Sequence, residues 1–289
     1  MGDFYALLTA VCWSFAVIFF DLSSNRLSPL QINIVKNSFG VIGFIITILF
    51  LSIPYPEFSN SDIFILMISG LVGVGIADLF FLESLKKIGS SLSAVVATIY
   101  APSVFIIAYI LFNEIITFNS LIGSVLVLFG IIISTYNSPK TSNPSYLFKG
   151  IIYGVLANIL TAVSVLSVKP IMVDNPILYV ALIRFSVGLI STMFFMIFRE
   201  GITKLFLTFY DGYKNILLLS GSFFGTYLSV ILWLAGYKYT LAGRAAIYNQ
   251  LSTIFISIMA VVILKEKITA KKKAGIFLSF LGAIIVSLK

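Results

Sequence analysis

The feature that most constrains this chain is a series of long apolar runs. A membrane-spanning helix needs about 20 predominantly apolar residues, because it has to cross roughly 30 Å of hydrocarbon. Ten runs near that length follow one another, and they cover residues 3–22, 31–53, 62–82, 91–112, 119–136, 148–168, 177–198, 214–236, 243–264 and 271–288. Backbone polar groups at that depth must bond within the segment, so each run is predicted to be a helix. We therefore expect an all-α integral membrane protein with ten transmembrane helices.

Two other interpretations of these runs do not fit the residue pattern. Residues 42–51 are apolar without alternation, whereas the strands of a membrane β-barrel alternate apolar and polar residues. The first run has no basic residue before it and no cleavage site of small residues after it. We therefore expect a retained membrane helix there, and not a signal peptide that is removed.

The composition excludes an ordinary water-soluble enzyme. Hydrophobic residues make up 60% of the chain and charged residues 10%, against about a quarter charged residues in a typical soluble domain. The chain has one cysteine and no histidine, so it offers no internal disulfide and no Cys/His group for zinc or an iron–sulfur cluster. We expect no metal and no cofactor. The formal net charge of +8 is interpreted as a determinant of membrane orientation, and not as a nucleic-acid-binding surface.

The chain also contains an internal repeat. When the sequence is shifted by 152 residues, 113–134 aligns without a gap to 265–286, and eight positions are identical. These are Glu114/Glu266, Ile116/Ile268, Thr117/Thr269, Gly123/Gly275, Leu126/Leu278, Gly130/Gly282, Ile132/Ile284 and Ile133/Ile285. At a shift of 148, residues 34–40 align with 182–188, which places Lys36 on Arg184. Chance similarity of two apolar helices explains shared Ile and Leu, but not polar and glycine positions in the same order.

The repeat predicts the architecture. Residues 1–138 and 146–289 each hold five of the predicted runs, and an odd number of crossings turns the second copy upside down relative to the first. Inverted repeats around a site near the middle of the bilayer are typical of secondary transporters, in which one half rocks against the other. We therefore predict two inverted five-helix repeats with a solvated cavity between them.

Several short motifs of this chain together point to a known family. They are Trp13-Ser14 in the first run, a basic residue in the second run of each half (Lys36 and Arg184), Asn113-Glu114 and Lys265-Glu266-Lys267 before the last run of each half, and the glycine pairs Gly123/Gly130 and Gly275/Gly282 within those last runs. With these motifs the whole chain resembles the EamA type of the drug/metabolite transporter superfamily. The resemblance implies a ten-helix permease of two halves that exports or exchanges amino acids and other small metabolites, commonly with proton coupling or by facilitated flux. The chain departs from a symmetric pattern at Trp13, because Asn158 or Ile159 stands at the corresponding place of the sixth run.

Three ionisable residues inside the runs are candidates for the substrate site. Charges at membrane depth cost a few kcal/mol, so they usually face a cavity or a partner. Lys36 and Arg184 would attract an anionic or zwitterionic substrate, for example through its carboxylate; alternatively, each reaches toward the interface or forms a structural ion pair. Asp78 in the third run would carry a proton for coupling, or it forms a fixed ion pair with Lys36 or Arg184.

Aromatic and amide side chains complete the predicted substrate site. Tyr and Trp offer an apolar ring with one polar atom, which suits an organic substrate, and buried amides need partners. The candidates are Trp13, Tyr100, Tyr227, Trp233, Tyr248, Asn249 and Gln250, on runs that line the central cavity according to the family resemblance, together with Asn158 at the place of Trp13 in the sixth run. The alternative is an aromatic belt at the membrane interface, and we expect it for the tyrosines near the ends of runs: Tyr5, Tyr109, Tyr136, Tyr237 and Tyr239.

The distribution of basic residues bears on orientation. Of the 19 Lys and Arg residues, 13 fall in the odd-numbered connections and four in the even-numbered connections and the C-terminus. The positive-inside rule then places the odd-numbered connections in the cytoplasm and both termini outside. The family resemblance instead implies cytoplasmic termini, so the two indications disagree.

These observations favour a secondary, non-ATP transporter that moves an amino acid or a related zwitterion or anion by alternating access, as an exporter or exchanger. Its expected partners are the small-molecule substrate, the lipid bilayer and protons as coupling ion, with no nucleic acid. We expect a multi-pass protein of the inner (plasma) membrane, as a monomer or weak homodimer. The alternative is an integral-membrane enzyme acting on a lipid-linked substrate, but the sequence has no DDxxD, no HExxH and no Ser/His pair. A non-transporting scaffold would not require paired cations within the membrane.

Overall fold

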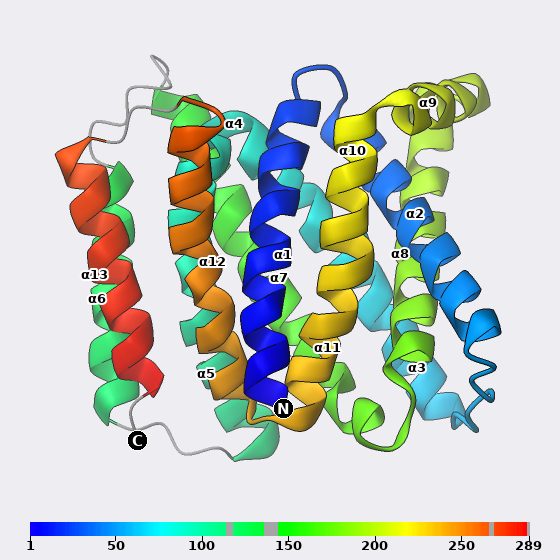
Figure 1. The fold of residues 1–289 in the computed structure, drawn as a ribbon, viewed down its shortest axis with the longest axis horizontal. Helices are drawn as coiled ribbons and strands as arrows, with labels where there is room; N and C mark the ends of the chain where they lie inside the picture. Colours follow the sequence, from blue (N-terminus) through cyan, green and yellow to red (C-terminus); the bar gives the residue numbers. More distant parts are fainter. Residues whose placement is uncertain (114–117, 136–143, 266–268, 288–289) are drawn as a thin grey trace.

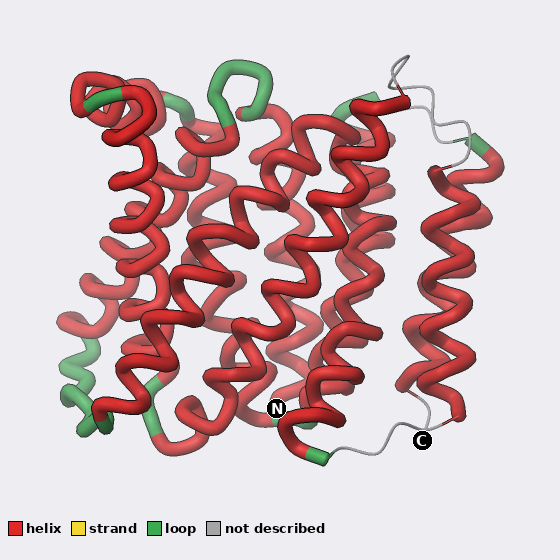
Figure 2. The backbone as a smooth tube through the Cα atoms, turned by 180° about the vertical axis from the view of Figure 1, so that it is seen from behind, coloured by secondary structure: helices red, strands yellow, loops and turns green. Residues whose placement is uncertain are grey.

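The computed structural model describes residues 1–113, 118–135, 144–265 and 269–287, and in these ranges it contains helices and no strand (Figure 2). The glutamates of the repeated motif, Glu114 and Glu266, and Tyr136 lie outside the described residues. The helices of the first part are α1 (Gly2–Ser23), α2 (Pro29–Phe50), α3 (Asn60–Ser69), η1 (Gly70–Ala77), α4 (Asp78–Val96), η2 (Ala97–Ile99), α5 (Tyr100–Phe112) and α6 (Phe118–Thr135). Those of the second part are α7 (Pro144–Asp174), α8 (Ile177–Glu200), α9 (Ile202–Lys214), α10 (Ile216–Gly221), η3 (Ser222–Leu228), α11 (Ser229–Tyr239), α12 (Ala242–Val262) and α13 (Ala270–Ser287).

Each of the ten predicted runs is helical over most of its described length, and residues 51–53, Asn215 and residues 263–264 lie outside the helices. By length and composition, seven helical segments of the described chain are able to cross a membrane: Gly2–Ser23, Pro29–Phe50, Asn60–Phe112, Pro144–Asp174, Ile177–Glu200, Ile216–Tyr239 and Ala242–Val262. One of the seven contains two predicted runs, and α6 and α13 coincide with the last run of each half without being among the seven. The fold is therefore that of a multi-pass helical membrane protein.

The segment Asn60–Phe112 reverses direction at Gly89. A straight α-helix of its 53 residues would be about 80 Å long, more than twice the hydrocarbon thickness. Gly89 has φ 73° and ψ 169°, a conformation that is costly for residues with a Cβ. The carboxylate of Asp21 in α1 accepts a hydrogen bond from the Ser90 backbone N–H at 3.1 Å, which satisfies one donor where the helix resumes. In Figure 1, α3 and α5 accordingly lie toward one end of the bundle and α4 toward the other.

The connection after α8 is itself a helix. α9 lies across the end of the bundle, roughly perpendicular to α8 (Figure 1). Leu205, Thr208 and Gly212 form its buried face, whereas Phe206 and Tyr210 are exposed. An amphipathic helix in this position is typical of one that lies in the membrane interface.

The surface and the interior show the reverse of the soluble pattern. Large apolar side chains such as Phe50 and Phe198 are exposed on the outside of the helices, while Lys36 and Arg184 are 4% and 1% exposed. Lipid tails accept apolar side chains without cost, whereas charged groups must be kept inside the protein. The interior of the bundle is therefore the place to look for a polar site.

The last helices of the two halves pack side by side (Figure 1). The glycines of their sequence motif, Gly123 and Gly130 in α6 and Gly275 and Gly282 in α13, are all buried. Glycines on one helix face allow two helix backbones to approach closely. The repeated glycine motif thus serves helix packing.

Candidate functional site

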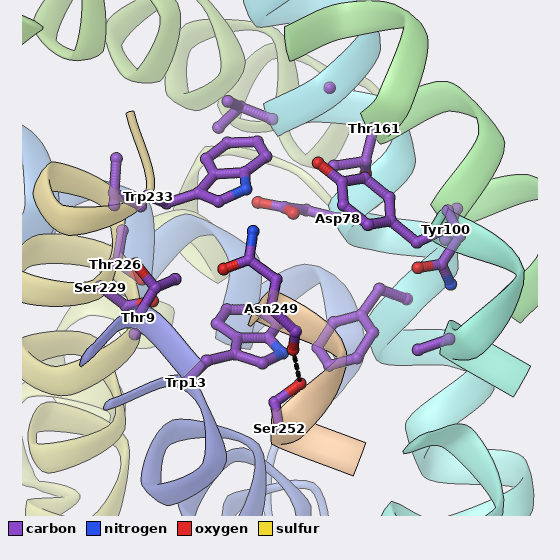
Figure 3. A pocket seen from close by; sticks show the side chains of 18 of the residues that line it. Thr9, Trp13, Asp78, Tyr100, Thr161, Thr226, Ser229, Trp233, Asn249 and Ser252 are labelled. Carbon is purple, nitrogen blue, oxygen red and sulfur yellow. Dashed lines mark hydrogen bonds between the residues drawn. The ribbon is translucent and has the colours of Figure 1, made fainter. Parts of the chain in front are cut away.

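A cavity of about 170 Å³ lies in the middle of the bundle. Each water in the liquid occupies about 30 Å³, so the cavity has room for about five or six waters or for a small organic molecule. Figure 3 shows side chains from α1, α4, α5, α7, α11 and α12 converging on it, among them Trp13, Asp78, Tyr100 and Trp233. Helices from both halves of the chain contribute to its wall.

Nine of the eleven predicted site residues line this cavity: Trp13, Lys36, Asp78, Tyr100, Asn158, Arg184, Trp233, Asn249 and Gln250. The other two, Tyr227 and Tyr248, do not belong to its wall. Each directly precedes or follows a lining residue, and neighbouring residues on a helix point in different directions. The Tyr227 hydroxyl bonds to the Thr47 hydroxyl at 2.6 Å, and Tyr248 packs against the main apolar core.

Lys36 and Asp78 form an ion pair at the edge of the cavity. Their Nζ and Oδ2 atoms are 2.5 Å apart, and the side chains are 5% and 22% exposed. The structure contains the ion pair with Lys36 that the sequence left open for Asp78, and the proton-carrying role of Asp78 stays a prediction. The pair is neutral as a whole, because each charge compensates the other.

A polar chain extends from this pair to the backbone of η1. Lys36 Nζ also donates to Asn37 Oδ1 at 2.9 Å, and Asn37 Nδ2 donates to Asn33 Oδ1 at 3.0 Å. Asn33 Nδ2 in turn donates to the carbonyl oxygens of Val74 and Gly75, at 3.3 and 3.4 Å. These carbonyls belong to η1, a π-helix, and π-helical turns inside longer helices frequently occur at functional sites. Lys36 is thus held from several sides.

Arg184 in α8 has a different environment. Its Nη2 donates to Ser164 Oγ at 2.9 Å, but Nε and Nη1 are buried and have no hydrogen-bond partner among the described residues. Ser164 is fixed because its Oγ donates to the Ser69 carbonyl at 2.9 Å. The absence of a side chain at Gly73 leaves room for the Ser164 and Arg184 side chains, since a Cβ there would lie 2.1 Å from Ser164 Oγ and 3.3 Å from Arg184 Nη2. An arginine with two unsatisfied nitrogens at a cavity wall can donate hydrogen bonds to an acceptor group of a bound molecule.

Aromatic rings form the apolar part of the wall. The rings of Trp13 and Phe81 are 5.3 Å apart between centroids, and the Trp233 ring centroid lies 5.8 Å from the Arg184 guanidinium carbon. A cation near an indole face gains electrostatic stabilisation. Trp233 also packs edge-on against Tyr237, at 5.7 Å.

The expected interfacial position of Tyr237 is wrong, because this side chain is fully buried. Its hydroxyl lies 2.6 Å from the hydroxyl of Tyr100, which lines the cavity. The sequence placed Tyr237 near the end of a run and could not show that α11 turns it inward. By contrast, Tyr109 and Tyr239 near their helix ends are exposed.

The amides differ in how well they are satisfied. Asn158 Nδ2 donates to the Gly154 carbonyl at 2.7 Å, and Gln250 Nε2 donates to the Ala97 carbonyl at 3.3 Å. Both the Nδ2 and Oδ1 atoms of Asn249 are buried without a partner among the described residues, and Figure 3 shows this side chain pointing toward the middle of the cavity. Asn249 therefore offers the N–H donors of its Nδ2 and its Oδ1 acceptor to a bound molecule.

Sequence reasoning missed several polar wall residues: Thr9, Thr161, Thr226, Ser229 and Ser252. A signal was present, because each lies one or two helical turns from a predicted residue on the same helix face. Thr9 lies four residues before Trp13, and Ser229 lies four residues before Trp233.

The described charged residues of the wall are two cations, Lys36 and Arg184, and one carboxylate, Asp78. No three His, Cys, Asp or Glu side chains come together as a metal-binding group within the described residues. The cavity therefore carries a net charge of about +1, which favours an anionic or zwitterionic molecule.

Comparison with known proteins bears on the family and the fold. The model of the EamA-like transporter family matches the chain twice, over residues 1–136 and 148–288. A protein of Archaeoglobus fulgidus described as an uncharacterized transporter is 25% identical over 288 residues, which cover 98% of this chain and 96% of that protein. A solved structure described simply as the crystal structure of a protein aligns with a TM-score of 0.73 at 12% identity, over 99% of this chain and 96% of that chain, which shows a shared fold.

The family and the transporter-named relative support a membrane transporter and not an enzyme. The apolar helices support a multi-pass membrane protein. Because the two matches of the family model span nearly the whole sequence, this chain belongs to the EamA-like transporter family, within the drug/metabolite transporter superfamily.

Proposed function

We propose that the protein is a secondary transporter that moves an amino acid or a related zwitterion or anion by alternating access, as an exporter or exchanger. The observation that carries the proposal is the central cavity, with its net positive wall built from both halves around Lys36, Asp78 and Arg184. Its aromatic rings and the free amide of Asn249 add contacts for an organic molecule. The alternative of an enzyme acting on a lipid-linked substrate has no such observation in its favour.

The architecture we propose for this mechanism is ten membrane crossings in two inverted five-helix halves, residues 1–138 and 146–289. The repeated sequence motifs and the two matches of the family model support it. A further support is that π-helices η1 and η3 occupy corresponding places, in the third long segment of each half. The reversal at Gly89 provides two crossings within Asn60–Phe112. The start of α1 and the end of α13 lie at the same end of the bundle (Figure 1), as an even number of crossings requires.

We propose that contacts on the side of the N-terminus form the closed end of the cavity. Gly2 packs directly against the backbone of Tyr239 at the end of α11, and the hydroxyl of Tyr237, two residues before that end, lies 2.6 Å from the hydroxyl of the wall residue Tyr100. Nearer the surface, Arg244 Nη2 donates to Asp3 Oδ2 at 2.6 Å. In an alternating-access cycle these contacts would open when the cavity faces that side.

Proton coupling would act through Asp78. Protonation of its carboxylate removes the charge that holds Lys36, so the ion pair and the attached η1 network would loosen. In proteoliposomes, flux should respond to an imposed pH difference, and Asp78→Asn should abolish this response. A response that persists in Asp78→Asn contradicts this role for Asp78.

For the membrane orientation we propose external termini in the plasma membrane, because the basic connections gather at the opposite end. A reporter that is active only outside the cytoplasm, fused after Lys289, should be active. Activity of a reporter that works only in the cytoplasm, fused at the same place, would contradict external termini. The oligomeric state we propose, a monomer or weak homodimer, is checked by the mass of the protein in detergent.

The transport experiment uses purified protein in liposomes preloaded with unlabelled amino acids. Labelled amino acid outside should accumulate by exchange, and Lys36→Ala, Arg184→Ala and Asp78→Asn should each reduce the initial rate. The exposed Lys86 provides the matched control, Lys86→Met, which should transport like the wild type. Exchange that survives all three substitutions contradicts the site, and product formation without flux would favour an enzyme.

A further inference from the structure

The two halves differ at one pair of corresponding positions. In the first half, η1 ends at Ala77 and the next residue is Asp78. In the second half, η3 ends at Leu228 and the next residue is Ser229. Each of these residues begins the α-helix that follows, and each lines the cavity. A carboxylate in one half thus corresponds to a hydroxyl in the other.

The partners of these residues correspond as well. Lys36 in α2 aligns with Arg184 in α8, and both side chains are buried in the cavity wall. Lys36 forms an ion pair with Asp78. Arg184 forms no ion pair with any described carboxylate. The second half therefore keeps the cation of the pair and lacks its anion.

We propose that Arg184 is the docking site for the carboxylate of the substrate, which occupies the place that the missing side-chain carboxylate leaves beside Ser229. The inference rests on the proposed transport function and assigns its anionic subsite to the second half. Lys36 and Asp78 then form a permanent ion pair, whereas Arg184 forms the corresponding ion pair only while a substrate carboxylate is bound.

The geometry near Arg184 fits this role. Nε and Nη1 are buried without partners, and an arginine fork binds a carboxylate through two parallel hydrogen bonds. Ser229 is 3% exposed and lies one turn before Trp233, whose ring is 5.8 Å from the guanidinium. Ser229 and Trp233 are four residues apart on α11, and both line the cavity. Asn249, also without a partner, can bind a second polar group of the same molecule.

The first experiment restores the missing carboxylate with Ser229→Asp and uses Ser229→Asn as the uncharged control of similar size. Thermal unfolding of the detergent-solubilised protein is measured for Ser229→Asp, Arg184→Gln and the double variant. Ser229→Asp should raise the midpoint by about 2–4 °C, and it should lower the midpoint when combined with Arg184→Gln. Equal effects of Ser229→Asp with and without Arg184 would overturn the proposal.

The second experiment tests ligands and does not need the aspartate variant to fold. The twenty amino acids are compared with their C-terminal amides, which lack the anionic carboxylate, by ligand-induced thermal shift. Amino acids that stabilise the wild type should lose this effect in Arg184→Gln and in Ser229→Asp, and should keep more of it in Ser229→Asn than in Ser229→Asp. The control variant Arg199→Gln, at an exposed position outside the cavity, should bind them like the wild type. Stabilisation by the amides as strong as by the free acids, or binding that is unchanged in Arg184→Gln, would overturn the proposal.

Failure of this inference and failure of the transport function give different results. If binding depends on Arg184 but no flux occurs in liposomes, the carboxylate site is supported and the transport function is contradicted. Exchange flux that is unaffected by Arg184→Gln keeps the transporter and contradicts the carboxylate site.

Discussion

The two buried cations, Lys36 and Arg184, have opposite environments. Lys36 is bound by a carboxylate and an asparagine, within a network that reaches the π-helix η1. Arg184 has one hydroxyl partner and two unsatisfied nitrogens. The difference teaches that the same feature in the sequence, a basic residue within the second run of each half, serves structure in one half and leaves binding capacity in the other.

Free energy explains why the contrast is informative. Removing one partner from a buried ion pair is strongly destabilising, because the remaining charge loses its compensation. A buried cation that is left incomplete in the folded protein is costly, and such residues in membrane proteins usually mark a substrate or ion pathway. Four substitutions test the contrast between Lys36 and Arg184.

Lys36→Met should have the largest effect on stability. It leaves the carboxylate of Asp78 without its cation, which costs about 3–5 kcal/mol in a dry interior. The Asp78 side chain keeps 22% exposure, so we expect the free energy of unfolding to fall by about 2–3 kcal/mol, at or below the lower end of that range. The double variant Lys36→Met/Asp78→Leu should recover most of it, and a double variant as unstable as the single one would contradict a structural role of the pair.

Arg184→Gln should behave in the opposite way. Stability should be unchanged or slightly raised, because the substitution removes two unsatisfied buried nitrogens. Binding of a carboxylate should weaken about 10- to 100-fold, since hydrogen bonds to charged groups contribute about 1.5–3 kcal/mol. Arg199→Gln at an exposed position is the matched control. Large destabilisation of Arg184→Gln with unchanged binding would remove the difference between the two cations.

Asn33→Ala tests whether the asparagine network holds Lys36 in the first half. Asn33 is fully buried and joins the Lys36 network to the η1 carbonyls of Val74 and Gly75. Its loss should destabilise the protein by about 1–2 kcal/mol, because it leaves Asn37 and the carbonyls short of partners. Asn25→Ala, at an exposed position, should be near neutral in the same thermal unfolding assay. Equal stability of both variants would show that the network does not hold Lys36.

Ser164→Ala should have the smallest effect. The substitution removes the hydroxyl that holds Arg184 Nη2, so the guanidinium gains freedom without losing its charge. We expect a several-fold weaker binding of carboxylates and a stability loss of about 1 kcal/mol. Titration by ligand-induced thermal shift measures the first effect. An effect on binding larger than that of Arg184→Gln would show that Ser164 itself contacts the ligand.

The helices could be predicted because the signal for a membrane helix is local. A run of apolar residues long enough to cross the bilayer must satisfy its own backbone, whatever surrounds it. The same argument found Lys36, Asp78 and Arg184, because a charge within such a run is exceptional. Wall residues such as Thr226 and Ser229 carried only the weaker signal of their spacing from Trp233, since small hydroxyl residues are common in membrane helices and bond to their own backbone.

Other features could not be predicted because they depend on packing between distant segments. The choice of Asp78 as partner of Lys36 depends on how α2 packs beside α4, and the inward turn of Tyr237 depends on how α11 faces α5. The sharp reversal at Gly89 is stabilised by Asp21 from another helix. The prediction that Tyr227 and Tyr248 line the cavity failed because the rotation of a helix about its axis is set by its neighbours.

The sequence by itself determined that this chain is a helical membrane protein with two related halves and rare charges inside its helices, because length, apolarity and repetition are properties of the chain alone. The tertiary structure decided which of those charges is neutralised. Electrostatic compensation requires two groups within a few ångströms of each other. Only the packing of the helices sets that distance, and it brings Asp78 to Lys36 while leaving Arg184 with a serine.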